Sequence, residues 1–299
     1  MFLLLGHGYW GKNIARAFGS DLYAVCEANE SLHGDIQKLY PHARIYTSYD
    51  AALRDSNVQA VIIATKAATH FKFAIEAIQR GKHVWIEKPA GTSTSEIDAI
   101  IRLSEKKDVR VFVDHVMCHD PMINKIRETV DFGSPIYFES YRLHQGLFQP
   151  DVGVIQDLAV HDLSIIDFIF PNQKLVSKDV ILNRHVNSLG DHAVLNMMFE
   201  SGLRATVTCS WVSPIKKRTM LIAGSNAMAV YRDGECDLIK VRKLDESFSQ
   251  EACKDVVPLV AEKSFGLENA RDRFKGGILR SEDMITDIYQ ARRIQSWLE

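Results

Sequence analysis

The chain has 299 residues, enough for two globular domains; 46% of them are hydrophobic and 25% are charged. Its 36 basic and 38 acidic residues give a formal net charge of −2, so no overall charge attracts nucleic acid or an anionic membrane. No apolar run approaches the roughly 20 residues that span a bilayer, and Met1–Leu5 lacks the features of a signal peptide. The five cysteines are scattered and odd in number, which favours a reducing cytoplasm over a disulfide framework.

The first predicted strand, Phe2 to Leu5, leads directly into a glycine-rich turn and a predicted helix over Lys12 to Phe18. The turn Gly6-His7-Gly8-Tyr9-Trp10-Gly11 has G-x-G-x-x-G spacing in the strand–turn–helix context that makes this pattern informative. The first glycine permits the tight turn, the second lets the backbone approach a pyrophosphate, and the third lets the helix pack close to the strand. Free amides at the helix N-terminus bind phosphate, so the sequence predicts a dinucleotide-binding domain.

An acidic residue ends the second predicted strand, Leu22 to Cys26. Glu27 lies 21 positions after Gly6 (27 − 6 = 21), where a dinucleotide-binding domain uses a carboxylate to hold the adenine ribose hydroxyls. Ala28-Asn29-Glu30 follows without a basic residue, so a 2′-phosphate would meet a carboxylate and no cation. NAD is therefore favoured over NADP.

Strands and helices alternate through the first part of the chain. Predicted strands cover Val58–Thr65, Lys82–Ile86 and Val109–Val113, and predicted helices cover Thr69–Arg80 and Ser95–Lys107. Repeated βα units predict a doubly wound parallel sheet with right-handed crossovers.

The pattern changes near residue 115, where strand-like segments with turn signals become more frequent. The predicted helices there are Ile123–Phe132, Leu163–Phe170 and Glu282–Trp297, and the predicted strands are Ala193–Glu200, Leu203–Trp211, Thr219–Ala223, Ala227–Tyr231 and Asp237–Val241. We expect an α/β fold: an N-terminal Rossmann domain over residues 1–116, and over residues 117–299 a C-terminal α/β domain with a large, mostly antiparallel sheet.

Ligands of open α/β sheets bind outside the carboxyl ends of the strands, and three strand ends here carry polar residues: Thr65–His70, Glu87-Lys88-Pro89 and Asp114-His115. Pro89 restricts the backbone of Lys88 and so fixes the direction of that residue. A lysine in a partly desolvated cleft can move a proton near neutral pH, which makes Lys88 a catalytic candidate. The alternative interpretation is a surface lysine at a strand–loop boundary.

A second candidate pair lies in Asp157-Leu158-Ala159-Val160-His161. In a helix, Asp157 and His161 share one face at positions i and i+4, so the carboxylate can orient an imidazole that transfers protons. A surface ion pair is the alternative.

We also considered a zinc site at His115, Cys118, His119 and Asp120, whose ligand types suit that metal. One extended segment cannot aim all four side chains at a single ion, so we expect no metal site.

These motifs together resemble the Gfo/Idh/MocA oxidoreductase family, named for glucose–fructose oxidoreductase and inositol 2-dehydrogenase, over nearly the whole chain. The resemblance rests on the glycine turn, Ala64-Thr65 with His70, Gly81-Lys82-His83 leading to Glu87-Lys88-Pro89, and Asp157-x-x-x-His161, in this order. The stretches Gly146–Ser164 and Ser210–Tyr231 resemble the branch found with surface-polysaccharide and nucleotide-sugar synthesis.

The resemblance implies an NAD(P)-dependent dehydrogenase that acts on a sugar, polyol or nucleotide-sugar carbon, assembled as a homodimer or homotetramer. It implies that Lys88 lies between nicotinamide and substrate, that His161 is catalytic, and that Asp157 supports it; which of Lys88 and His161 is the base stays open. The cofactor-binding residues are expected to be Gly6, His7, Gly8, Tyr9, Trp10, Gly11, Glu27, Thr65, His70, Glu87 and Lys88. The substrate-binding residues are expected to be Lys88, Tyr141, Arg142, Gln145, Asp157 and His161.

Three points stay open at this stage. Lys66 stands where the family usually has proline, which puts the path of the loop after that strand in question. A non-catalytic NAD-binding regulator or scaffold of the same fold is the alternative function, although a sensor has no need of both Lys88 and His161. Arg142 is equally compatible with pairing to a phosphate or carboxylate and with an ordinary place on a strand surface.

Overall fold

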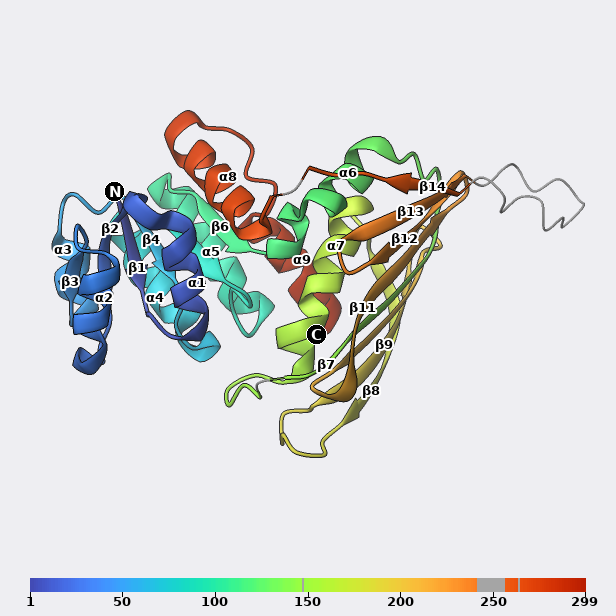
Figure 1. Cartoon of the computed structure of the whole chain (residues 1–299), viewed down its shortest axis with the longest axis horizontal. Helices are drawn as coiled ribbons and strands as arrows, with labels where there is room; N and C mark the ends of the chain where they lie inside the picture. Colours follow the sequence, from blue (N-terminus) through green and yellow to red (C-terminus); the bar gives the residue numbers. More distant parts are fainter. Residues whose placement is uncertain (147, 241–255, 263) are drawn as a thin grey trace, which may run out of the picture. The chain divides into compact units, whose positions relative to one another are not determined.

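The computed structural model describes residues 1–146, 148–240, 256–262 and 264–299. The chain divides into two compact units, coloured along the sequence in Figure 1. Unit 1 comprises Met1–Val116 and Gly266–Glu299, and unit 2 comprises Met117–Phe265. The predicted strand residue Val241 and the fifth cysteine, Cys253, lie outside the described residues.

Unit 1 contains a six-stranded parallel sheet in the order β3-β2-β1-β4-β5-β6. Its strands are β1 (Phe2–Leu5), β2 (Leu22–Cys26), β3 (Arg44–Tyr46), β4 (Ala60–Ile63), β5 (His83–Glu87) and β6 (Val111–Asp114). Its helices are α1 (Tyr9–Phe18), α2 (His33–Leu39), α3 (Tyr49–Arg54), α4 (Ala67–Gln79), α5 (Thr94–Lys107), α8 (Gly266–Arg280) and α9 (Ile288–Leu298), with short 3₁₀ turns at Gly19–Asp21 and Glu30–Leu32. The strand order reverses between β1 and β4, as in a Rossmann domain, and the predicted fold class is confirmed.

Both faces of this sheet are buried, because successive residues of each strand point to opposite sides. Leu3 and Leu5 of β1 pack in one apolar core with α3, α4, α5 and α9. Phe2 and Leu4 pack in a second core with α1 and α8. Continuous apolar strands are what a parallel sheet covered on both faces requires.

The C-terminal helices belong to unit 1, which differs from the predicted division that carried the second domain to residue 299. Phe274 of α8 is fully buried, with its ring centroid 5.6 Å from those of Trp85 and Phe112. Ile288 and Ala291 of α9 join the other core. These apolar contacts give the reason for the difference.

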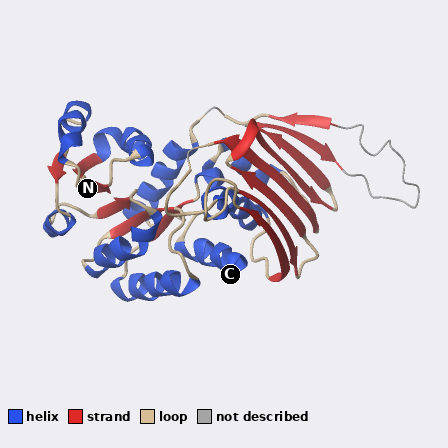
Figure 2. Ribbon diagram, turned by 90° about the horizontal axis from the view of Figure 1, so that it is seen from below, coloured by secondary structure: helices blue, strands red, loops and turns tan. Residues whose placement is uncertain are grey.

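Unit 2 contains an eight-stranded sheet in the order β14-β13-β12-β11-β7-β10-β9-β8 (Figure 2). The strands are β7 (Pro135–Gln145), β8 (Leu175–Asn183), β9 (His192–Phe199), β10 (Arg204–Ser210), β11 (Val212–Gly224), β12 (Ala227–Arg232), β13 (Glu235–Lys240) and β14 (Val256–Leu259). Its helical elements are a 3₁₀ turn at Val116–His119, α6 (Pro121–Thr129), a π-helical turn η4 (Ile155–Ala159) and α7 (Val160–Ile169). All pairings are antiparallel except β7 with β10, so the sheet is mixed and mostly antiparallel, as expected.

None of the helices in the described part of the chain has both the length and the apolar character that a bilayer span requires.

Candidate functional site

The glycine turn lies between β1 and α1, and its backbone explains the glycine spacing. Gly6 has φ of +90°, and a Cβ on it would lie 2.9 Å from the carbonyl oxygen of Ala64. A Cβ on Gly11 would collide with the carbonyl oxygen of Gly6, so the third glycine is required by close helix packing. A Cβ on Gly8 would meet nothing within 4 Å, which leaves open space beside the backbone at the N-terminus of α1. This cradle fits a diphosphate held by backbone amides.

Glu27 follows β2 and is oriented by two backbone amides. Its Oε2 accepts a hydrogen bond from the amide of His7 at 2.8 Å, and its Oε1 accepts one from the amide of Asn29 at 2.9 Å. The carboxylate is therefore fixed beside the glycine turn, where the ribose hydroxyls of a dinucleotide are held in this fold. His7 is itself buried, and Tyr9 is exposed.

His70 connects the loops that follow β4 and β5. Its Nδ1 lies 2.8 Å from the carbonyl oxygen of Pro89, and its Nε2 lies 3.0 Å from that of Thr65. The loop with Lys66 forms an ordered helix start, since the Lys66 carbonyl accepts hydrogen bonds from the amide and the hydroxyl of Thr69 at 2.9 and 2.7 Å. Lys66 in place of proline is therefore compatible with a well-formed turn.

Two carboxyl groups meet at the ends of β5 and β6. Glu87 and Asp114 are direct neighbours in the parallel register, and their residues are only 6% and 1% exposed. Burial and the neighbouring Asp114 raise the pKa of Glu87 well above its usual range. Burial also raises the pKa of Asp114 to about 6. Lys88, next in the chain, lowers both pKa values and is half-buried.

Trp10 links the glycine turn to this acid pair. The indole Nε1–H of Trp10 donates a hydrogen bond to Oε1 of Glu87 at 2.7 Å. His115, next to Asp114, is buried, and burial lowers its pKa to about 3, so its ring is neutral at physiological pH. Unit 1 thus brings the glycine turn, Glu87 and Lys88 into one connected region.

Asp157 and His161 lie in unit 2 on one continuous helical stretch, η4 followed by α7. The indole Nε1–H of Trp211, a fully buried residue, donates to Oδ2 of Asp157 at 3.1 Å. The π-helical turn at Ile155–Ala159 is a rare form that occurs often at functional sites. Trp211 therefore fixes the orientation of the carboxylate that the sequence had singled out.

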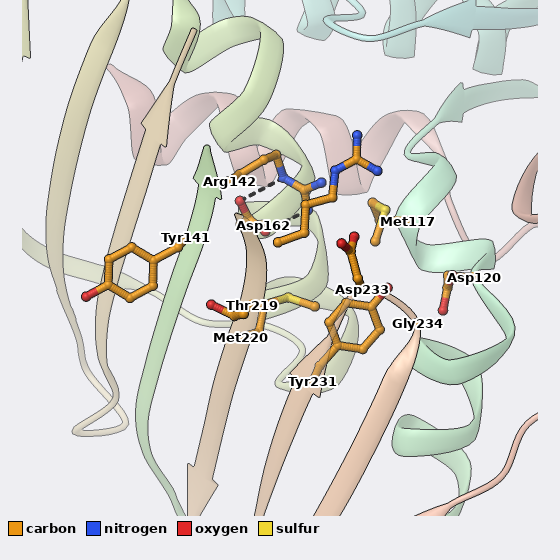
Figure 3. A pocket seen from close by; sticks show the side chains of 11 residues that line it. Met117, Asp120, Tyr141, Arg142, Asp162, Thr219, Met220, Tyr231, Asp233 and Gly234 are labelled. Atoms are coloured by element: carbon orange, nitrogen blue, oxygen red, sulfur yellow. Dashed lines mark hydrogen bonds and ion pairs between the residues drawn. The ribbon is translucent and has the colours of Figure 1, made fainter. Parts of the chain in front are cut away.

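Arg142 of β7 is buried and paired, so it is not an ordinary surface arginine. Its Nε and Nη2 donate to Oδ2 and Oδ1 of Asp162 at 3.0 and 2.8 Å, a bidentate geometry. Asp162 raises the pKa of Arg142 despite the opposing effect of burial. The pair lies at a cavity of about 220 Å³ in unit 2 (Figure 3). The cavity is lined by Met117, Asp120, Tyr141, Arg142, Asp162, Arg218, Thr219, Met220, Tyr231, Asp233 and Gly234.

Tyr141 and Arg142 point to opposite faces of the sheet, as neighbours on a strand must. Figure 3 shows the Tyr141 side chain directed away from the Arg142–Asp162 pair. The Tyr141 hydroxyl donates to Oε1 of Glu139 at 2.6 Å, and Nζ of Lys217 lies 3.7 Å from its ring centroid. Gln145 is exposed at the end of β7.

The residues considered as zinc ligands have other contacts. Asp120 caps α6 by accepting hydrogen bonds from the amides of Met122 and Ile123 at 2.9 and 3.1 Å. The Cys118 thiol lies 3.5 Å from the carbonyl oxygen of Ser164, to which it donates. In the residues that the structure describes, no group of three or more His, Cys, Asp or Glu side chains is placed to hold a metal ion.

A Rossmann sheet with a glycine cradle at α1 and an oriented carboxylate after β2 defines a dinucleotide-binding domain. Residues 1–115 match the sequence model of the oxidoreductase family with an NAD-binding Rossmann fold, and residues 127–230 match that of the GFO/IDH/MocA C-terminal domain. The chain belongs to the Gfo/Idh/MocA family, and it is an oxidoreductase that uses a nicotinamide dinucleotide.

Individual relatives agree with this assignment. The UDP-N-acetylglucosamine 3-dehydrogenase of Acidithiobacillus ferrooxidans is 30% identical over 224 residues, which are 73% of this chain and 69% of that protein. The NADP-dependent scyllo-inositol 2-dehydrogenase of Bacillus subtilis is 22% identical over 243 residues, 77% of this chain and 68% of that protein. A crystal structure of the Acidithiobacillus enzyme superposes with a TM-score of 0.88 at 25% identity, covering 99% of this chain and 94% of that chain.

Proposed function

We propose that this chain is an NAD-dependent dehydrogenase that interconverts a hydroxyl and a keto group on one carbon of a sugar, and that the sugar is carried on a nucleotide. The observation that carries the proposal is Lys88 at the carboxyl end of β5, in the same unit as the glycine cradle and Glu27. The 30% identity to a nucleotide-sugar dehydrogenase supports the substrate class.

Each residue has a proposed role in this reaction. Bound NAD supplies the hydride acceptor in one direction and the hydride donor in the other. The amides of the glycine cradle hold the diphosphate, and Glu27 holds the adenine ribose hydroxyls. Either Lys88 or His161 takes the proton of the substrate hydroxyl. Asp157, held by Trp211, supports His161.

The remaining predicted contacts complete the proposal. Thr65, His70 and Glu87 are assigned to the cofactor side, where His70 connects the two loops and Glu87 carries the hydrogen bond from Trp10. Arg142 and Gln145 are assigned to the substrate side, whereas the Tyr141 side chain leaves the opposite face of the sheet and is not assigned to it. Of these, Arg142 contributes a buried ion pair with Asp162 next to His161, which supports its place at the cavity in unit 2.

Unit 2 is also proposed to carry the contacts of a homodimer or homotetramer. Helices α6 and α7 cover one face of its sheet, and the open face carries Tyr137, Tyr141 and Ile181, the last 54% exposed. Analytical ultracentrifugation of the full chain tests the oligomeric state. A monomer at micromolar concentration would contradict the proposed homodimer or homotetramer. We further propose a cytoplasmic location, because the described cysteines, Cys26, Cys118, Cys209 and Cys236, are all free thiols.

Two measurements test the catalytic proposal. Titration with NADH and NADPH should give tighter binding of NADH, because Glu27 meets the ribose with no cation at residues 28–30. Tighter NADPH binding would contradict the role of Glu27. A panel of UDP-linked sugars and free polyols, followed at the absorbance of the reduced nicotinamide, then identifies the substrate class. NADH binding without turnover of any member would favour the regulator instead.

A lysine variant tests the role of Lys88. Lys88→Met should lower kcat by about 10²–10⁴ while the Kd of NADH changes by less than about twofold, because proton handling is lost and phosphate binding is not. Lys106→Met is the matched control, since Lys106 is exposed in the last turn of α5. Full turnover in Lys88→Met would overturn the assignment.

A further inference from the structure

The buried acid pair Glu87–Asp114 is not explained by any role given so far. Its two residues end neighbouring parallel strands and occupy the same register position, so their side chains leave the sheet side by side. Both residues are nearly inaccessible to solvent, at 6% and 1% exposure. Two ionised carboxylates in such a place repel each other with little screening by water.

The contacts around the pair leave it short of hydrogen-bond donors. Oε1 of Glu87 accepts from the indole of Trp10 at 2.7 Å. Both side-chain oxygens of Asp114 are buried and have no hydrogen-bond partner among the described residues. Two ionised carboxylates have no donor between them. A proton on one of the two carboxyl groups supplies the donor that this buried pair lacks.

The groups that face the pair come from three elements. The charge of Lys88, at the end of β5, lowers the pKa values of both carboxyl groups and so stabilises their ionised forms. The hydrogen bond from Trp10 of α1 has the same effect. His115, which follows β6, is neutral because burial lowers its pKa to about 3. The pKa of Asp114 is raised to about 6 and that of Glu87 well above its usual range, so both shifts favour a proton on the buried pair.

The position of the pair relates it to the redox end of the cofactor. A dinucleotide lies across the point where the strand order reverses, here between β1 and β4. Glu27, after β2, marks the adenosine half, so the ends of β5 and β6 lie toward the nicotinamide half. The nicotinamide ring is cationic when oxidised and neutral when reduced. Only the oxidised ring therefore favours a more negative acid pair.

We propose that Glu87 and Asp114 share a single proton, and that the pair releases this proton to solvent when the oxidised cofactor binds but keeps it when the reduced cofactor binds. Asp114 and Glu87 thereby act as positioning residues that couple cofactor charge to protonation beside Lys88. The proposal rests on the nicotinamide cofactor and does not depend on which sugar is the substrate.

Linkage fixes the sign of the effect. Because the oxidised cofactor binds the deprotonated pair more tightly, its Kd should fall as pH rises through the titration of the pair, by at most about tenfold per pH unit. The Kd of NADH should stay nearly constant over the same range. The ratio of the two values is therefore the quantity to follow.

The first experiment follows the carboxyl groups without cofactor. Infrared spectra of the full chain should show the carbonyl band of a buried protonated carboxyl group at pH 7. Asp114→Asn should remove this band, because Glu87 then has only donors and the Lys88 ammonium around it. Absence of the band in the unaltered chain, or its persistence in the variant, would overturn the shared proton.

The second experiment counts protons on binding. Calorimetric titration in two buffers of different ionisation enthalpy should show release of up to one proton with NAD⁺ and none with NADH. Asp114→Asn should abolish the difference. The control Asp287→Asn should retain it, since Asp287 is a half-buried carboxyl of unit 1 with a raised pKa and asparagine is an equally good helix cap.

A second variant keeps the proposal testable if Asp114→Asn does not fold. Trp10→Phe removes the donor to Glu87, so proton release on NAD⁺ binding should move to higher pH. Equal proton numbers for the two cofactors, or an unchanged pH dependence in Trp10→Phe, would overturn the coupling. A chain that bound neither cofactor would contradict the cofactor assignment and the coupling together. A wrong sugar assignment would leave both readouts unchanged, because neither uses a substrate.

Discussion

At the scale of single residues, Asp191 organises the turn that precedes β9. Its carboxylate accepts hydrogen bonds from the amides of His185, Val186 and Asn187 and lies 3.0 Å from Nδ1 of His185. Burial alone would raise its pKa, but the amides of Val186 and Asn187 and the His185 side chain hold the pKa at about 2. A carboxylate with a lowered pKa stabilises the fold above the ordinary value near 4, and this stabilisation is lost as pH falls toward 2.

Asp191→Asn should therefore lower the free energy of unfolding by about 2 kcal/mol at pH 7, the worth of hydrogen bonds to a charged group. The difference from the unaltered chain should shrink between pH 5 and pH 2. Urea denaturation at several pH values measures both. Asp179→Asn on exposed β8 is the control and should change little. A difference that grew on acidification would contradict the sign.

Residue patterns in the sequence indicated several residues of the candidate site, but not the side chains that these residues contact. Glu27 and Lys88 were predicted because a local motif surrounds each of them. The contacts of Glu87 with Asp114, of Arg142 with Asp162 and of Asp157 with Trp211 join positions 27, 20 and 54 residues apart. Such pairs depend on the register of the strands and the placement of the helices, and the spacing of residues along the chain does not reveal either. Asp162 and Trp211 were accordingly not among the predicted site residues.

At the scale of elements, the glycine cradle depends on the approach of α1 to the end of β1. Gly11→Ala should abolish measurable NADH binding, because the added Cβ would collide with the Gly6 carbonyl oxygen and push the helix N-terminus away. Gly34→Ala in α2 is the matched control, since its Cβ would meet nothing within 4 Å, and it should stabilise the chain by about 0.5–1 kcal/mol. Fluorescence titration with NADH compares cofactor binding by the Gly11→Ala and Gly34→Ala variants. Normal binding by Gly11→Ala would contradict the cradle.

Element prediction succeeded where the pattern was strong and failed where glycine and charge interrupted it. The predicted helix at Ser95–Lys107 is α5, capped by Ser93. The turn between β9 and β10 spans residues 200–202, where the Phe199 amide donates to the Leu203 carbonyl. Helix α8 was not predicted. Its sequence contains Gly276, Gly277 and many charged residues, and its apolar face consists of Phe274 and a few neighbours, so the helical pattern of apolar residues is weak.

At the scale of the whole molecule, the core of unit 1 requires a residue from the far end of the chain. Phe274→Ala should lower the free energy of unfolding by about 3–5 kcal/mol, because it empties a fully buried position against Trp85 and Phe112. Leu279→Ala in the same helix, 65% exposed, should cost less than about 0.5 kcal/mol. Thermal denaturation of both variants measures this. Equal melting temperatures would contradict the role of α8 in the core.

The return of the chain to unit 1 has a consequence for how the protein is made. Residues 117–265 leave the ribosome before residues 266–299, although the latter supply the helices α8 and α9 that pack in the core of unit 1. During synthesis, Trp85 and Phe112 of the Rossmann sheet therefore lack their contacts with Phe274 after the whole inserted unit has been synthesised. Domains generally fold as units while the chain is still being extended. We expect the inserted unit to fold first and the core of unit 1 to close only after residues 266–299 have been synthesised.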